Sequence, residues 1–228
     1  MARKIKIDNA VLKRFESKAR KRKVGHIPLR KYFLIICEGA KTEPNYFEAL
    51  KKRLPPGVME YIEIEGEGRN TLNLIEEAEK IRNEKESQSI LKRFDYTWAV
   101  FDRDSFPAEN FDNAIHKAQE LKRKIDCAWS NEAFELWYLL HLEFINTPLS
   151  RKDYGPKIEK WLSQRMGKKF KYTKNRPDMY RLLQQYGNEE QAIKWAGKLD
   201  ESYTSAKYST HNPCTKVYLL VEQLNQLT

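Results

Sequence analysis

Three acidic residues stand directly after predicted buried strands. Glu38 follows the apolar run Phe33–Cys37, and Asp102 and Asp104 follow the run Asp95–Phe101. The carboxyl ends of parallel strands meet at one edge of a sheet, so we expect these carboxylates to converge there. Converging carboxylates repel one another unless a proton or a cation lies between them. Hard oxygen ligands suit Mg²⁺ or Mn²⁺, which can activate water and stabilise charge on a phosphodiester. Glu38, Asp102 and Asp104 are therefore the candidate metal ligands and catalytic residues.

A fourth candidate is Glu135, which lies among apolar residues in the segment 131–144. A carboxylate in such surroundings needs a partner, and a metal, a lysine or a capping hydrogen bond would each serve. We expect Ser130 to cap a helix here, which places Asn131 and Glu135 on one helical face. His141, near the end of this segment, is either a general base or, more simply, a hydrogen-bonded histidine at a helix end. His211 could fold back over the site from the segment before the last predicted helix.

The chain alternates between predicted strands and helices from residue 32 to about residue 145. Such alternation predicts parallel strands joined by right-handed crossovers. We therefore expect a small, doubly wound, mainly parallel α/β domain over residues 32–145, with strand order 2-1-3-4. Residues 146–228 show no convincing strand and form a predicted helical C-terminal region, with helices near 153–165, 177–186, 189–201 and 213–227. This region is either a separate subdomain or a cover over the sheet.

The excess positive charge of the chain lies in its first 31 residues. The formal net charge of the 228 residues is +10, and residues 1–31 alone carry twelve lysines and arginines against two acids. We treat this segment as a basic N-terminal arm, with its densest run at Arg20, Lys21, Arg22 and Lys23. Such an arm suits contact with phosphate backbones, although a solvated tail has the same composition.

A second basic segment lies at residues 168–180, where basic and aromatic residues are interleaved. Lys171, Tyr172 and Lys174 are candidates for phosphate contact and for stacking on unpaired bases. An exposed loop that does not bind nucleic acid could have the same composition. Lys41, close to Glu38, could neutralise a phosphate or could simply be solvated.

The three cysteines are far apart and form no C-x-x-C pair, which argues against a zinc cluster or a disulfide framework. A reducing, cytoplasmic setting fits this usage best. No apolar run approaches the ~20 residues of a membrane span, and the basic N-terminus lacks the apolar region of a signal peptide. We therefore expect no membrane association.

Four motifs follow one another along the chain, namely "CEGAKTEPNYFEAL", "FDRD", "SNEAFELWYLLH" and "NPCTKVYLLVEQL". Together they resemble the RloB-like proteins, which also occur as the AbiLii component of abortive-infection systems. The resemblance runs from about residue 30 to the end. It implies a Toprim-type core, with a glutamate after the first strand and a D-x-D motif after the third. Glu38, Asp102 and Asp104 match these positions. Glu43 matches an acid that helps to hold a second metal in related nucleases, although a helix dipole also favours an acid there.

The resemblance also implies a function, namely a metal-dependent nuclease that cleaves DNA or RNA in antiphage defence. Related Toprim effectors cleave tRNA, which favours RNA slightly. The implied partners are nucleic acid and an AAA- or ABC-type ATPase, and a homodimer is a further candidate assembly. Two alternatives stay open: a non-catalytic nucleic-acid-binding partner of a defence ATPase, and a phosphatase-like metal hydrolase.

Overall fold

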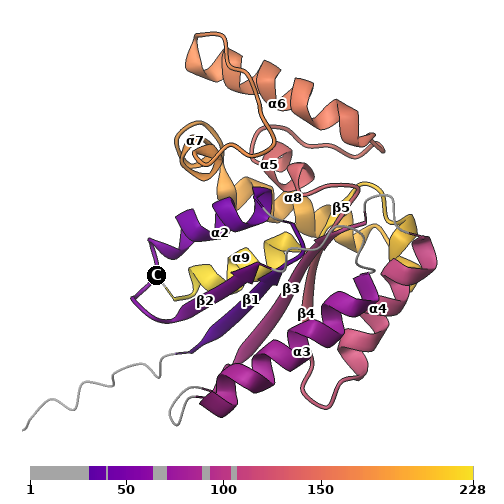
Figure 1. Ribbon diagram of the computed structural model, residues 1–228. Coiled ribbons are helices and arrows are strands. Elements are labelled where there is room, and N and C mark those ends of the chain that lie inside the picture. The colour runs from indigo at the N-terminus through magenta and orange to yellow at the C-terminus, as the bar shows by residue number, and fades with distance from the viewer. Residues whose placement is uncertain (1–30, 40, 64–70, 89–92, 104–106, 228) are drawn as a thin grey trace, which may run out of the picture. The chain divides into compact units, whose positions relative to one another are not determined.

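The computed structural model describes residues 31–39, 41–63, 71–88, 93–103 and 107–227. The predictions for Asp104 and for Arg20, Lys21, Arg22 and Lys23 concern residues outside these ranges. Lys31–Thr228 forms one compact unit. The predicted α/β class with a mostly parallel, open sheet is confirmed for this unit (Figure 1).

The strands are arranged in the order β2-β1-β3-β4-β5. Neighbouring strands are parallel except for β4 and β5, which pair antiparallel. In chain order the strands are β1 (Phe33–Cys37), β2 (Met59–Glu63), β3 (Tyr96–Asp102), β4 (Asp126–Asn131) and β5 (Cys214–Thr215). The chain winds outward from β1 in both directions, so the neighbours β1 and β3 flank the point where the winding reverses.

Helices cover both faces of the sheet. The helices α3 and α4 lie on one face, and α2 and α9 lie on the other, with α5 to α8 beyond them (Figure 1). The helical bounds are α2 (Thr42–Lys51), α3 (Thr71–Gln88), α4 (Ala108–Glu120), α5 (Glu135–Leu140), α6 (Arg151–Met166), α7 (Met179–Tyr186), α8 (Glu189–Glu201) and α9 (Val217–Asn225), with a short 3₁₀ helix η1 (Tyr208–Thr210).

The strand β1 is buried on both sides, which explains its five consecutive apolar residues. Phe33 and Ile35 belong to the hydrophobic cluster under α2 and α9, whereas Leu34 and Ile36 belong to the cluster under α3 and α4. Successive side chains of a strand point to opposite faces, so a central parallel strand requires an unbroken apolar run. This central strand ends immediately before Glu38.

The C-terminal region contains a strand that sequence reasoning missed. β5 is two residues long, and it pairs Thr215 with Ser130 and Cys214 with Asn131. The Ser130 and Thr215 hydroxyl groups hydrogen-bond at 2.9 Å. This pairing extends β4 through Asn131, so the prediction that Ser130 caps a helix was wrong, and α5 begins only at Glu135.

The region after residue 146 shares a core with the sheet. Tyr154 and Ile158 of α6, Leu183 of α7 and Val221 of α9 belong to the same hydrophobic cluster as Phe33 of β1. Of the two arrangements left open by the sequence, the structure has the one in which this region covers one face of the sheet. Within the described residues, no helix combines the length and the apolar character that crossing a bilayer would require.

Candidate active site

Glu38 and Asp102, two of the predicted site residues, lie at the carboxyl ends of neighbouring strands. Asp102 is the last residue of β3. Glu38 follows β1, and its main-chain N–H donates to the carbonyl of Val100 at 3.0 Å, which continues the β1–β3 pairing past Cys37. Glu38 is partly exposed, whereas Asp102 is buried. The backbone therefore delivers both carboxylates to the carboxyl edge of the sheet.

Two further carboxylates are buried beside Asp102. Glu43 comes from the first turn of α2, and Glu135 is the first residue of α5. Asp102, Glu43 and Glu135 are only 8%, 6% and 5% exposed. We call these three residues the carboxylate cluster. Its members come from three different elements, so the tertiary fold, not local sequence, brings them together.

Burial and mutual repulsion dominate the electrostatics of this cluster. Burial, followed by the charges of Glu43 and Glu135, raises the pKa of Asp102 well above its usual value. Burial also raises the pKa of Glu43, and the charge of Glu135 adds to this effect. The Arg151 charge acts in the opposite direction on both groups, but it does not cancel the shift. The nearby cationic side chains therefore do not compensate the charges of the cluster.

Two buried oxygens of the cluster meet no hydrogen-bond donor in the described part of the chain. They are Oδ1 of Asp102 and Oε2 of Glu135. A buried acceptor without a partner is costly, and a cation would satisfy both atoms. The donor set consists of carboxylate oxygens and thus fits Mg²⁺ or Mn²⁺ in its chemistry. However, the described residues contain no group of three or more His, Cys, Asp or Glu residues already placed to hold a metal.

The glycine after Glu38 makes room for Glu43. A Cβ atom built on Gly39 would collide with the Glu43 carboxyl group. Only glycine therefore lets the loop after β1 lie against this carboxylate without moving it. This contact places Glu43 next to the loop that carries Glu38. It also explains why a glycine follows Glu38 in the sequence.

The segment 170–175 closes against the carboxylate cluster. The Tyr172 hydroxyl group donates to Oε1 of Glu135 at 2.9 Å. The Thr42 hydroxyl group donates to the carbonyl of Lys174, also at 2.9 Å. The Tyr138 hydroxyl group in turn donates to the carbonyl of Thr42 at 3.2 Å. Sequence reasoning gave Tyr172 a role in base stacking and missed its contact with Glu135, because the two residues are far apart along the chain.

Exposed lysines lie around this site. Lys41 is the residue before α2, and Lys171 and Lys174 flank Tyr172. The Lys174 charge lowers the pKa of Glu43, which shows that it lies near the cluster. Arg151, at the start of α6, is a further cation of the site that the sequence did not single out. No local pattern marks Arg151, because only the packing of α6 brings it close.

The other polar candidates lie in different surroundings. Nδ2 of Asn131 donates to the carbonyl of Ser209 at 3.0 Å, so Asn131 is a strand residue tied to η1 and shares no helical face with Glu135. His141 is buried, and its Nδ1 donates to the carbonyl of Trp137 at 2.8 Å. Burial lowers the pKa of His141 to about 4. His141 is thus the hydrogen-bonded histidine at a helix end. His211 stacks on Tyr203 at 4.5 Å between ring centroids.

Comparison with protein families agrees with the motifs that build this site. The model of the RloB-like protein family matches residues 33–224. The chain belongs to the RloB-like family. The match includes Glu38 and the whole carboxylate cluster of this RloB-like chain. Comparison with curated proteins and with solved structures gave no match.

We expect Asp102→Asn to stabilise the metal-free RloB-like protein at neutral pH. The pKa of Asp102 is higher in the folded than in the unfolded state, so ionised Asp102 opposes folding. The gain is about 1.4 kcal/mol for each unit of that pKa difference. It is full above the folded pKa and disappears as the pH falls towards the ordinary value of about 4. Urea unfolding with a chelator, at several pH values, measures it. A variant that is less stable than wild type at every pH would contradict the repulsion described above.

We expect Tyr172→Phe to destabilise the metal-free protein by about 1–3 kcal/mol, because it leaves a further Glu135 oxygen buried without a donor. Tyr186→Phe is the matched control. Tyr186 is also partly buried, and its hydroxyl group makes no hydrogen bond within the described ranges. Urea unfolding curves of both variants give the difference. Equal losses in the two variants would show that the Tyr172–Glu135 hydrogen bond contributes nothing.

Proposed function

We propose that this RloB-like protein is a metal-dependent nuclease with a Toprim-type core, which cleaves phosphodiester bonds of nucleic acid in antiphage defence. The observation that carries the proposal is the burial of Glu43, Asp102 and Glu135 side by side, close to the loop that carries Glu38. Two of their oxygens meet no donor among the residues that the structure describes. Perturbed carboxylates at the carboxyl edge of a parallel sheet are characteristic of functional sites.

In this proposal the carboxylate cluster holds Mg²⁺ or Mn²⁺, together with Glu38 and the sequence-predicted ligand Asp104. A bound ion of this kind supplies activated water and neutralises charge on the phosphate. Glu38 is more accessible than the three cluster residues, so it is also the candidate for accepting or donating a proton. Tyr172 holds the Glu135 carboxylate in place through its hydroxyl group.

The proposed substrate is a nucleic acid because cationic side chains lie near the acidic site. Lys41, Lys171 and Lys174 are exposed and can contact phosphates on either side of the bond to be cleaved. The basic arm of residues 1–31 adds further phosphate contacts in this proposal. The family resemblance favours RNA, and tRNA in particular, over DNA.

A second candidate function is that of a non-catalytic, nucleic-acid-binding partner of a defence ATPase. The exposed Lys41, Lys171 and Lys174 would serve nucleic-acid binding without any cleavage. In that case the carboxylate cluster would hold a structural ion while the ATPase performs the chemistry. The cleavage experiment below separates the two functions.

We expect the purified protein to cleave tRNA, single-stranded DNA or plasmid DNA when Mg²⁺ or Mn²⁺ is present. Asp102→Asn and Glu38→Gln should each lower the rate by about 100-fold or more. Loss of a metal ligand removes several kcal/mol of transition-state stabilisation, and each 1.36 kcal/mol is about tenfold in rate. Gel analysis of labelled substrates, with and without a candidate AAA- or ABC-type ATPase partner, provides the measurement.

Glu120→Gln is the control for these variants, because Glu120 is an exposed acid at the end of α4. It should cleave at the wild-type rate. Absence of cleavage for every substrate, also with the ATPase present, would contradict the nuclease function and favour the non-catalytic partner. Cleavage that survives in Asp102→Asn would place the active site elsewhere.

We expect the double variant Lys171→Gln, Lys174→Gln to bind single-stranded nucleic acid more weakly. Each lost phosphate contact should reduce the slope of log affinity against log salt by about 0.7. Fluorescence anisotropy at several salt concentrations measures both quantities. The control pair is Lys124→Gln, Lys194→Gln, which removes the same charge from exposed positions outside the site. An equal effect of the two pairs would show that only net charge matters.

A further inference from the structure

The strand β4 has an edge that is only half covered. On one side it pairs with β3 along Asp126–Ser130. On the other side β5 pairs with Ser130 and Asn131 alone, and α9 begins at Val217, directly after Lys216. Among the described strands, none pairs with Asp126–Trp129 on this outer side. An open strand edge presents unpaired N–H and C=O groups that another strand can bind.

The direction of these main-chain groups follows from the hydrogen bonds that are present. The carbonyl of Ser130 accepts from the N–H of Arg103, so Ser130 faces β3. Alternate residues of a strand face opposite sides, so Cys127 and Trp129 face the outer edge. The carbonyl of Trp129 accepts from the N–H of Lys216 at 2.7 Å. Within the described ranges, β5 pairs with Ser130 and Asn131 alone, so the outward-facing main-chain groups of Cys127 have no strand partner there.

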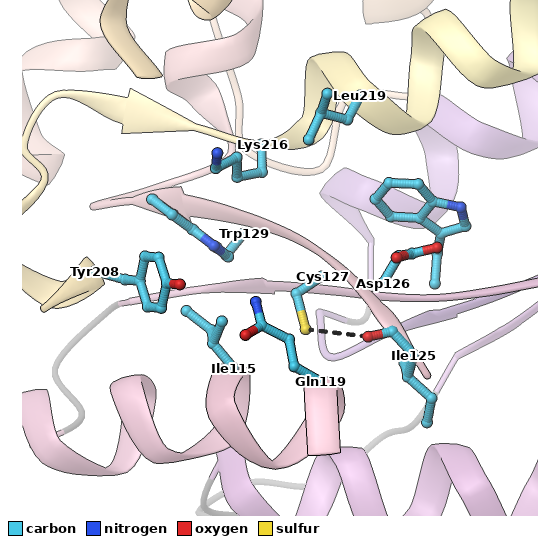
Figure 2. Close-up of a pocket in the computed structure, with 10 residues that line it drawn as sticks. Ile115, Gln119, Ile125, Asp126, Cys127, Trp129, Tyr208, Lys216 and Leu219 are labelled. Carbon is cyan, nitrogen blue, oxygen red and sulfur yellow. Dashed lines mark hydrogen bonds between the residues drawn. The ribbon is translucent and has the colours of Figure 1, made fainter. Parts of the chain in front are cut away.

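A groove of about 190 Å³ runs along this open edge (Figure 2). Ile115 and Gln119 of α4 bound it on one side, and Leu219 of α9 bounds it on the other. The groove reaches both faces of the sheet, because Trp98 and Trp129 both line it but belong to different hydrophobic clusters. Leu219 is 36% exposed, which is unusual for a large apolar side chain in the described part of the molecule.

The groove contains one acidic side chain, Asp126, that forms no ion pair with another described residue. Lys216 forms an ion pair with Asp200, so its charge is already compensated. Asp126 is exposed and lies at the start of β4, and no ion pair or side-chain hydrogen bond joins it to another described residue. Desolvation raises the pKa of Asp126, and only the charge of Lys124 opposes this shift. An occupant with a positive charge beside β4 would therefore complement the groove.

We propose that the open edge of β4 binds an extended peptide segment of a partner protein, which adds as a strand and carries alternating basic and apolar residues. An added strand supplies the N–H and C=O groups that Cys127 lacks. Its side chains alternate between two faces, as the groove requires, so that apolar residues contact Ile115 and Trp129 on one face. Lysine or arginine on the other face reaches Asp126. A flat small molecule could hydrogen-bond to the strand edge, but it would leave one face of the groove empty.

This proposal is independent of the nuclease function, because the groove shares no residue with the carboxylate cluster. It also differs from the protective role that a charged residue often has on a strand edge, where a charge discourages pairing. In that role Asp126 would oppose any added strand, because pairing would bury its charge. The two roles predict opposite results for a basic peptide.

The test uses the full chain and a fluorescent, end-capped Lys-Val-Lys-Val-Lys-Val peptide, with Glu-Val-Glu-Val-Glu-Val for comparison. We expect saturable binding of the basic peptide alone, followed by anisotropy. Asp126→Lys should weaken this binding at least tenfold. Glu109→Lys, at an exposed position at the start of α4, should bind as wild type does. Asp102→Asn should also bind normally, which separates the groove from the carboxylate cluster.

Two further measurements test the mode of binding. Amide hydrogen exchange should slow at Cys127 when the peptide binds, and a peptide methylated on alternate main-chain nitrogens should not bind. Absence of binding at millimolar peptide, or equal binding by Asp126→Lys and wild type, would overturn the proposal. Pairing of β4 with a second copy of the chain, seen as a dimer in sedimentation that Asp126→Lys abolishes and the peptide does not displace, would also overturn it.

Discussion

The repulsion between three buried carboxylates is the constraint on which the rest of this site depends. Asp102, Glu43 and Glu135 are almost wholly removed from water, and their charges oppose one another. A fold keeps such an arrangement only if the surrounding structure over-determines it. Here the sheet fixes Asp102, the close approach of Gly39 leaves space for Glu43, and the Tyr172 hydroxyl group holds Glu135. The cluster therefore lowers the stability of the metal-free protein, and a bound cation would remove the repulsion between its carboxylates.

The architecture explains why the cluster forms at this place. β1 and β3 are central and buried on both faces, so their carboxyl ends are fixed by cores on both sides. The C-terminal helices share one of these cores, which brings the segment 170–175 against the site. The strand β5 ends after two residues, so no described strand pairs with the outer side of Asp126–Trp129 in β4. The acidic site and the open strand edge thus lie at opposite ends of β4.

Local patterns in the sequence were sufficient for the α/β class, for β1 and for the position of Asp102. An unbroken run of five apolar residues indicates a buried strand, and an acid directly after it lies at the end of that strand. The same patterns could not reveal β5, because two residues carry no periodicity and their pairing with Ser130 is a long-range contact. They also missed the bond between Tyr172 and Glu135, which depends on how α6 and the following segment pack. Contacts between distant segments are set by the whole core, not by any window of sequence.

The central claim is that the carboxylate cluster binds a divalent cation, and titration of the chelator-treated protein with Mn²⁺ tests it most directly. Isothermal titration calorimetry and thermal unfolding should both detect binding to the wild type, with stabilisation of about 2.7 kcal/mol when free Mn²⁺ is 100 times its Kd. Asp102→Asn and Glu135→Gln should lose this binding, and Glu120→Gln should retain it. Binding of the same affinity and stoichiometry in all four proteins would place the ion elsewhere and contradict the account.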